Sequence, residues 1–366
     1  MIPFLDLRRE HDLLREGIDE RIRRVIYDNS NFILGKEGEM FEKEFAGYCG
    51  KEYGVGVNSC TDALELALSS QNIGHGDEVI LPVNTAIPTA MAVSNVGAIP
   101  IFCDVREDYL IDPNEIKKKI TEGTRAIVPV HLYGLACNMD NINEIARENN
   151  LAVIEDCAQA SGAEYKGKKV PVGEVGCFSF YPSKNLGALG DGGMIVTSRK
   201  DLSDKLKLLR NYGQEDKYKA SITGRNTRLD EIQAAVLRLK LEHLDEGNSR
   251  RREIASFYDS ELERFVTIPQ SGSDKKHVYH LYVIRTSNRD ELTKDLKENG
   301  IGTLIHYPIP LHLQGAFFGR NGNIYGDYPN AERFAKEIVS IPLFPGLTES
   351  EIDEVADRIK SFKRSA

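Results

Sequence analysis

The run Cys177-Phe-Ser-Phe-Tyr-Pro-Ser-Lys-Asn-Leu-Gly-Ala-Leu-Gly-Asp-Gly-Gly193 decides the fold. It predicts an apolar, aromatic-rich strand over 177–181 that stops at Pro182 and is followed at once by Lys184. A lysine at the end of a buried strand is partly removed from water, which favours the neutral amine that attacks carbonyls and forms Schiff bases. The glycines allow the backbone to approach a bulky planar group, or simply to turn. On these residues alone, a surface lysine in a glycine-rich turn explains the run equally well.

Two upstream junctions decide between these interpretations. The apolar run 151–155 ends in Asp156, as in a buried parallel strand whose carboxyl end carries function. The strand predicted over 53–57 breaks at small polar residues that include Cys60 and Thr61, and a helix follows. Such a helix start presents free backbone N–H groups to an anion. A carboxylate, a phosphate cradle and a strand-end lysine together predict pyridoxal 5′-phosphate (PLP) as the cofactor.

Composition excludes several classes of protein. A net charge of −9 argues against a general nucleic-acid binder, which needs a basic face. The six cysteines are scattered without a CxxC pair, so we predict neither a metal site nor a disulfide framework, which suits a cytoplasmic protein. The amino terminus lacks the apolar core of a signal peptide, and no run approaches 18 apolar residues, so we expect no membrane span.

The order of predicted elements indicates an α/β fold. An amphipathic helix is expected over 8–29 as packing material for the core. Strands are then expected at 77–81, 99–104, 125–131 and 151–155, alternating with helices at 85–96, 114–120 and 139–149. Repeated units of this kind predict a mostly parallel sheet with helices on both faces.

Beyond the glycine-rich run the pattern changes. The polar stretch 211–227 is predicted to be a functional loop, and a long helix is expected over 229–244. From residue 247 onward, helices surround isolated strands. We therefore predict a large cofactor-binding domain over 1–245 and a smaller α+β domain over 246–366.

Motifs along nearly the whole chain resemble those of one family. They are Pro3-Phe-Leu-Asp-Leu7, Gly56-Val-Asn-Ser-Cys-Thr61, Val128-Pro-Val-His-Leu-Tyr-Gly134, Glu155-Asp-Cys-Ala-Gln159, Phe178-Ser-Phe-Tyr-Pro-Ser-Lys-Asn185, Gly224-Arg-Asn-Thr-Arg-Leu-Asp-Glu-Ile-Gln-Ala-Ala235 and His306-Tyr-Pro-Ile-Pro-Leu-His312. In this order they resemble the DegT/DnrJ/EryC1/StrS family of PLP-dependent sugar aminotransferases. The resemblance implies the aspartate aminotransferase fold, known as PLP fold type I.

The resemblance implies roles around the cofactor ring. Lys184 is expected to form the internal aldimine and then to move a proton between the substrate carbon and the cofactor. Asp156 is expected to keep the pyridine nitrogen protonated, and Gln159 to lie beside the ring and its hydroxyl. Helix capping or a loop ion pair would be the ordinary role of Asp156.

The cofactor phosphate is expected on the N–H groups of Cys60 and Thr61, with hydroxyls from Thr61 and Ser179. Thr61 as a helix N-cap is the competing role, and both can hold together. Asn226 matches an asparagine that, in the family, reaches the phosphate from the partner subunit, which implies a homodimer with shared active sites. Ala86 stands where relatives often place an aromatic over the ring, so the ring's stacking partner stays open.

Five residues are substrate-contact candidates by resemblance, because tyrosine and histidine can bond sugar hydroxyls and lysine can meet a diphosphate. They are Tyr181, Lys217, His306, Tyr307 and His312. Packed or solvated loop residues are the alternative for each.

The predicted enzyme is a transaminase that moves an amino group from L-glutamate to a nucleoside-diphosphate keto sugar. The motifs at 209–214, 226–230 and 306–314 resemble the branch that aminates C3, so we expect a dTDP-3-keto-6-deoxyhexose as substrate and a dTDP-3-amino-3,6-dideoxyhexose as product. A 4-keto sugar nucleotide is the alternative acceptor. A sugar dehydratase of the same fold is disfavoured, because such relatives replace the lysine that Lys184 retains. A non-catalytic regulatory protein is disfavoured by the intact pair of Asp156 and Lys184.

Overall fold

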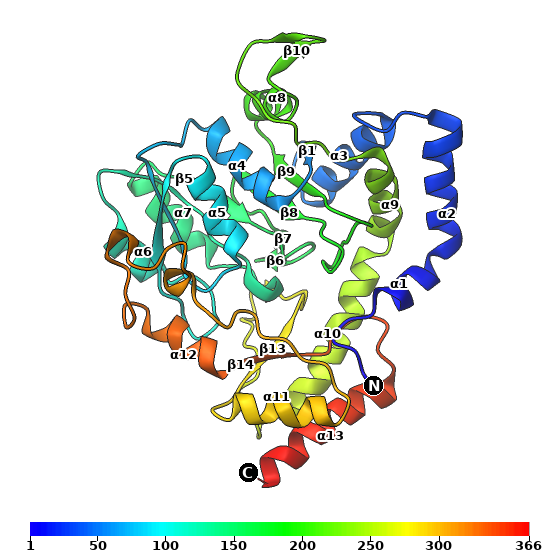
Figure 1. Cartoon of the computed structure of the whole chain (residues 1–366), viewed down its shortest axis with the longest axis vertical. Coiled ribbons are helices and arrows are strands. Elements are labelled where there is room, and N and C mark those ends of the chain that lie inside the picture. Colours follow the sequence, from blue (N-terminus) through cyan, green and yellow to red (C-terminus); the bar gives the residue numbers. More distant parts are fainter. Residues whose placement is uncertain (366) are drawn as a thin grey trace.

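A seven-stranded sheet forms the centre of the molecule in the computed structural model, which describes residues 1–365 (Figure 1). Its spatial order is β1-β9-β8-β5-β4-β2-β3. The strands are β1 (Tyr53–Val57), β2 (Glu78–Pro82), β3 (Ile99–Cys103), β4 (Thr124–Ile127), β5 (Ala152–Asp156), β8 (Val175–Ser179) and β9 (Gly193–Thr197). Strands β8, β5, β4, β2 and β3 pair in parallel, whereas β9 runs antiparallel to both β8 and β1. The mostly parallel sheet is therefore confirmed.

Helices cover this sheet because each parallel connection must cross over it. Helix α4 (Cys60–Ser70) packs on α5 (Ile87–Asn95) and α8 (Lys200–Leu209) and against β5, β8 and β9. Helices α6 (Pro113–Lys119) and α7 (Met139–Glu148) contact each other, and they pack against β3 and β5 respectively. Helix α3 (Lys36–Tyr48) pairs with α9 (Glu231–Glu242) beside β1. Every residue of β8 and β9 is buried, as expected for strands covered on both faces.

Three segments differ from the sequence prediction. The single helix expected over 8–29 is divided into α1 (Leu7–Leu13), α2 (Arg15–Arg23) and the π-helical η1 (Arg24–Asn29), because Leu14 leaves helical geometry at φ −111° and ψ 10°. Its apolar side is not all packing material, since Leu13 is 81% exposed. Strand β4 ends at Ile127 rather than 131, two residues before Pro129, which has no N–H to donate to a ladder. The loop predicted over 211–227 contains a hairpin, β10 (Gln214–Asp216) and β11 (Lys219–Ala220), which projects at the top of Figure 1.

The carboxy-terminal part packs on a second apolar cluster. This carboxy-terminal part of the chain comprises α10 (Leu244–Leu262), β13 (Tyr282–Arg285), α11 (Arg289–Glu298), α12 (Pro329–Glu337), β14 (Ile338–Ile341) and α13 (Glu349–Ser365). Strand β13 pairs antiparallel with β14, and Ile2 from the amino terminus completes the cluster. Residues such as Val278 and Phe334, however, pack into the large core. The division at 245/246, which falls within α10, stays a prediction.

Short elements complete the chain. They are β6 (Glu164–Tyr165), β7 (Lys168–Lys169) and β12 (Lys275–Lys276), which form a small sheet, and the 3₁₀ turns η2 (Leu132–Gly134), η3 (Leu311–Leu313) and η4 (Arg320–Gly322). Across residues 1–365, no helix combines the length and the apolar character needed to cross a bilayer.

Candidate active site

A cavity of about 240 Å³ opens where strands β5 and β8 end and helices α4 and α5 begin. Carboxyl ends of parallel strands are where open α/β sheets place ligands. Seven of the residues predicted to bind cofactor or substrate line this cavity together: Cys60, Thr61, Asp156, Gln159, Ser179, Tyr181 and Lys184. Segments more than a hundred residues apart in the chain therefore converge on one site.

Asp156 is held in one orientation at the end of β5. Asp156 is only 4% exposed. Oδ1 accepts the N–H of Ala158 at 3.0 Å, and Oδ2 accepts the hydroxyl of Thr89 at 2.9 Å. Burial raises the pKa of Asp156, whereas these hydrogen bonds and the positive charge of Lys184 oppose that rise. The carboxylate is thus oriented and poised to accept a cationic partner.

Thr89 was missed by sequence reasoning. It lies three residues after Ala86, in the stretch 84–89, where the sequence draws attention only to the alanine in place of an aromatic. A hydroxyl two residues into a helix has no signature of its own, so only the packing of α5 against β2 and β3 of the sheet reveals the contact.

Lys184 follows β8 in the turn predicted for it. Its N–H donates to the carbonyl of Tyr181 at 2.8 Å, which closes the turn after Pro182. A Cβ on Gly187 would lie 2.3 Å from the carbonyl oxygen of Pro182, so the turn requires glycine there. Burial lowers the pKa of the Lys184 amine, although Asp156 opposes the shift. Both effects together leave an amine that is closer to its nucleophilic neutral form than a surface lysine.

The start of α4 forms the predicted anion cradle. Ser59 is the N-cap, since its Oγ accepts the N–H of Asp62 at 3.1 Å, so Thr61 is not the N-cap. Within residues 1–365, the N–H groups of Cys60 and Thr61 have no hydrogen-bond acceptor. A Cβ on Gly193 would lie 2.4 Å from the carbonyl carbon of Ser59, which explains the glycine under this turn. Two free N–H groups at a helix start, beside a buried carboxylate and an amine, fit the phosphate, ring nitrogen and aldehyde of PLP.

Gln159 and Tyr307 are joined at the edge of the cavity. The Oε1 of Gln159 accepts the N–H of Tyr133 at 2.6 Å, and its Nε2 donates to the Tyr307 hydroxyl at 3.1 Å. Tyr307, a predicted substrate contact from the carboxy-terminal part, is thereby connected to the cofactor site. The amide of Gln159 has both ends occupied, so its position is fixed.

Other predicted residues are not brought to this cavity. His312 is completely buried, does not line this cavity, and its Nε2 lies 3.0 Å from a carboxylate oxygen of Glu332; a contact with substrate therefore stays a prediction. His306 lines a neighbouring cavity, and its Nδ1 lies 2.8 Å from the Ser340 hydroxyl. Lys217 and Asn226 lie exposed on the segment that carries the hairpin, and neither lines the cavity of its own chain.

Ala86 does line the cavity, but it offers only a methyl group. Val130 and Ala158 also line it, so the walls contributed by these positions are aliphatic. The aromatic that relatives often place at position 86 therefore has no counterpart there.

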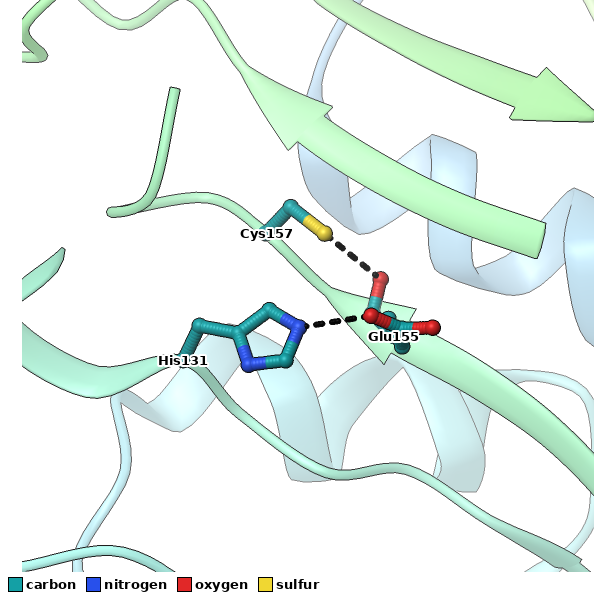
Figure 2. A group of neighbouring side chains, drawn as sticks. All are labelled: His131, Glu155 and Cys157. Carbon is teal, nitrogen blue, oxygen red and sulfur yellow. Dashed lines mark hydrogen bonds and ion pairs between the residues drawn. The ribbon is translucent and has the colours of Figure 1, made fainter. Parts of the chain in front are cut away.

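A buried group beside the site, His131, Glu155 and Cys157, has the composition of a metal site (Figure 2). Its hydrogen bonds are already made within the chain. His131 accepts the N–H of Cys137 at Nδ1 (3.0 Å), so its Nε2–H donates to Glu155 (2.8 Å). Glu155 also accepts the N–H groups of Val172 and Gly173, and the Cys157 thiol points to the Glu155 carbonyl oxygen. This group ties β5 to the segment before β8 and needs no ion.

Comparison with known proteins agrees with this geometry. The sequence profile of the DegT/DnrJ/EryC1/StrS aminotransferase family matches residues 13–360. The chain belongs to this family. It is 45% identical over 365 residues to dTDP-3-amino-3,4,6-trideoxy-alpha-D-glucose transaminase of Streptomyces venezuelae, covering 99% of this chain and 96% of that protein. It is 46% identical to dTDP-3-amino-3,6-dideoxy-alpha-D-galactopyranose transaminase of Aneurinibacillus thermoaerophilus, covering 99% of both chains.

A solved structure extends the agreement to the fold. The crystal structure of S. venezuelae DesV in complex with a ketimine intermediate superposes with a TM-score of 0.97 at 45% identity, covering 99% of this chain and 98% of that one. The predictions of PLP fold type I, of an aminotransferase and of PLP as cofactor are confirmed. In this chain Cys60, Thr61, Asp156 and Lys184 are the residues that fit PLP, which supplies the electron sink for chemistry at the amino-bearing carbon.

Proposed function

We propose that this aminotransferase moves an amino group from L-glutamate to C3 of a dTDP-linked 3-keto-6-deoxyhexose, giving the dTDP-3-amino-3,6-dideoxyhexose. The observation that carries the proposal is the buried pair of Asp156 and Lys184 in a cavity that fits PLP. The sugar is supported by two relatives at 45% and 46% identity, both named as transaminases of dTDP-3-amino sugars.

The residues have separable tasks in this proposal. The Lys184 amine takes the proton from the donor carbon and returns a proton on the other side of the transfer. Asp156 supplies the negative charge that keeps the ring nitrogen protonated, and Thr89 with the Ala158 N–H keeps that charge in place. Tyr181, which is more than half exposed at the cavity mouth, and Tyr307 are proposed to contact the hexose.

Two further proposals concern the assembly and its location. A homodimer with shared sites is supported by the projecting hairpin segment, since Lys217 and Asn226 are exposed and do not line the PLP-fitting cavity of their own chain. The six cysteines, all of them free, support a cytoplasmic location. Neither nucleic acid nor a membrane is a proposed partner.

The test is to offer dTDP-linked 3-keto and 4-keto 6-deoxyhexoses separately, each with L-glutamate. We expect the 3-keto sugar alone to gain an amine, located at C3 by NMR. Amination confined to C4 would overturn the regiochemistry and leave the aminotransferase in place. A matched reaction with L-alanine as the amino donor shows whether L-glutamate is preferred.

A further inference from the structure

A second cavity, of about 310 Å³, adjoins the turn that carries Lys184. Ser183, the residue before Lys184, contributes to its wall, together with Arg251 from α10, His280 and His306. Leu304 and Ile341 are among its apolar residues, and no aspartate or glutamate lines it. Its volume is at the lower end of small-molecule pockets, which span about 300–1,000 Å³.

Arg251 is a buried cation with no carboxylate at ion-pair distance, although the charge of Glu10 attracts it from farther away. It is 4% exposed, and its Nη1 donates to the carbonyl oxygens of Leu343 at 2.9 Å and Tyr279 at 3.3 Å. Among residues 1–365, Nε and Nη2 of Arg251 have no hydrogen-bond acceptor. Burial lowers the pKa of Arg251 to about 10, so the guanidinium stays charged at neutral pH. Charged groups are rarely buried without a counterion, which makes this arginine a site for an anion.

The two histidines of the cavity add hydrogen-bonding groups but no charge. The His280 Nδ1 lies 3.1 Å from Oδ1 of Asn185, whose amide nitrogen already donates to Asn248, so the imidazole donates at Nδ1. Burial, with the positive charges of Lys184 and Arg251, holds the pKa of His280 well below its usual range. Burial lowers the pKa of His306 to about 4. The cavity therefore offers one positive charge, which matches one carboxylate.

We propose that this cavity holds a carboxylate group of the amino-acid donor, with Arg251 as its counterion. The inference rests on the proposed function, because it assigns a place to the donor named there. Apolar walls suit the methylene chain of a dicarboxylic amino acid, and a guanidinium binds a carboxylate through two parallel hydrogen bonds. The acceptor's diphosphate is the other anion of the reaction, and the experiments separate the two.

The first experiment measures the two half-reactions of the holoenzyme separately by stopped-flow absorbance. In Arg251→Met we expect the apparent Kd for L-glutamate to rise about tenfold or more, while the half-reaction with the keto sugar keeps its rate and Kd. The apparent Kd of Arg251→Lys for L-glutamate should fall between those of the wild type and Arg251→Met, since lysine keeps the charge but loses the paired donors. The control is Arg250→Met, one residue along α10, where the guanidinium pairs with Glu349 outside the cavity; it should stay within about twofold. An unchanged Kd for L-glutamate, or a loss confined to the keto sugar, would overturn the assignment.

A second pair of variants keeps the test valid if Arg251→Met does not fold. Leu304 is 49% exposed and lines the same cavity, so polar replacements are tolerable there. Leu304→Glu places a competing carboxylate near Arg251, and we expect it to weaken L-glutamate binding at least tenfold more than Leu304→Gln does. Equal effects of the two variants would mean that charge in this cavity does not matter to the donor.

Calorimetry with glutarate provides a readout that does not depend on turnover. Glutarate should bind the wild-type holoenzyme, and Leu304→Glu should weaken this binding. Adding dTDP to the wild-type holoenzyme should leave the Kd for glutarate unchanged. Competition between glutarate and dTDP would assign the cavity to the diphosphate instead. If no keto sugar is aminated while L-glutamate and glutarate behave as expected, the proposed acceptor fails and the carboxylate site stands.

Discussion

The hydroxyl of Thr89 donates a hydrogen bond to Oδ2 of Asp156 across 2.9 Å and so joins the first turn of α5 to the end of β5. The buried Thr85 hydroxyl lies 3.2 Å from that of Thr89, within hydrogen-bond distance. With the Ala158 N–H on the other oxygen, the carboxylate proposed to pair with the ring nitrogen of PLP has fixed donors on both sides. Orientation of this carboxylate therefore depends on α5 and on the segment that follows β5, not on β5 alone.

Replacing Thr89 by valine removes this donor at nearly constant volume. Since the hydrogen bond lowers the pKa of Asp156, its loss should raise that pKa and weaken the charge opposite the ring. We expect both half-reactions to slow about tenfold or more, because hydrogen bonds to charged groups are worth ~1.5–3 kcal/mol. The bound cofactor's absorbance should titrate with a shifted pKa, an effect that a purely structural role would not produce. Thr85→Val is the matched control and should have a smaller effect.

Asp156→Asn keeps the shape of the side chain and removes its charge. PLP should still bind, while the half-reaction rates fall by about 100-fold or more, which corresponds to ~3 kcal/mol in the barrier. Stopped-flow absorbance measures the rates, and equilibrium dialysis measures cofactor retention. Near-normal turnover would mean that another group protonates the ring.

Lys184→Ala should abolish both half-reactions and the visible absorbance band of the bound cofactor. Borohydride treatment followed by mass spectrometry should attach the cofactor permanently to the wild type at Lys184 and to no residue of the variant. Lys43→Ala, at an exposed lysine, serves as the control. A band that survives in Lys184→Ala would contradict the cofactor assignment.

Shared active sites predict complementation between inactive variants. Lys184→Ala and Asn226→Asp should each be inactive, and mixing them under conditions of subunit exchange should restore up to about a quarter of the activity. The physical reason is that one of the hybrid's two sites then combines an intact Lys184 with an intact Asn226. If exchange is verified by mass spectrometry and no activity returns, each site is built within one chain.

His277 predicts a loss of stability in mild acid. It is buried, accepts the N–H of Tyr279 at Nδ1 (2.8 Å), and burial lowers its pKa to about 3. In the unfolded chain a histidine titrates near 6.5, so between pH 6.5 and 3 the unfolded state binds the extra proton and stability falls as pH falls. At pH 5 this histidine alone should cost about 2 kcal/mol relative to pH 7. Urea unfolding at both pH values should show a smaller difference in His277→Gln than in the wild type, whereas His75→Gln, at an exposed histidine, should show the wild-type difference.

The sequence by itself determined the parts of the site that depend on local order along the chain. A strand that ends in Asp156, a strand that ends before Lys184, and a helix that begins at Cys60 each follow from an apolar run and the residues that stop it. Parallel strands bring their carboxyl ends to one edge, so the convergence of these residues could be predicted without coordinates. The motifs supplied the family for the same reason, since they are local stretches in a fixed order.

Only the tertiary structure decided which side chains from other elements complete the site. Thr89 meets Asp156 because α5 packs against the sheet, and Arg251 faces a cavity without acids because Phe4, Leu304 and Ile341 are packed around it. His312 and Tyr307 belong to the same sequence motif, yet Tyr307 contacts Gln159 while His312 is buried against Glu332. Burial and hydrogen-bond partners are set by contacts between residues far apart in the chain, and a side chain's own sequence neighbours carry no record of them.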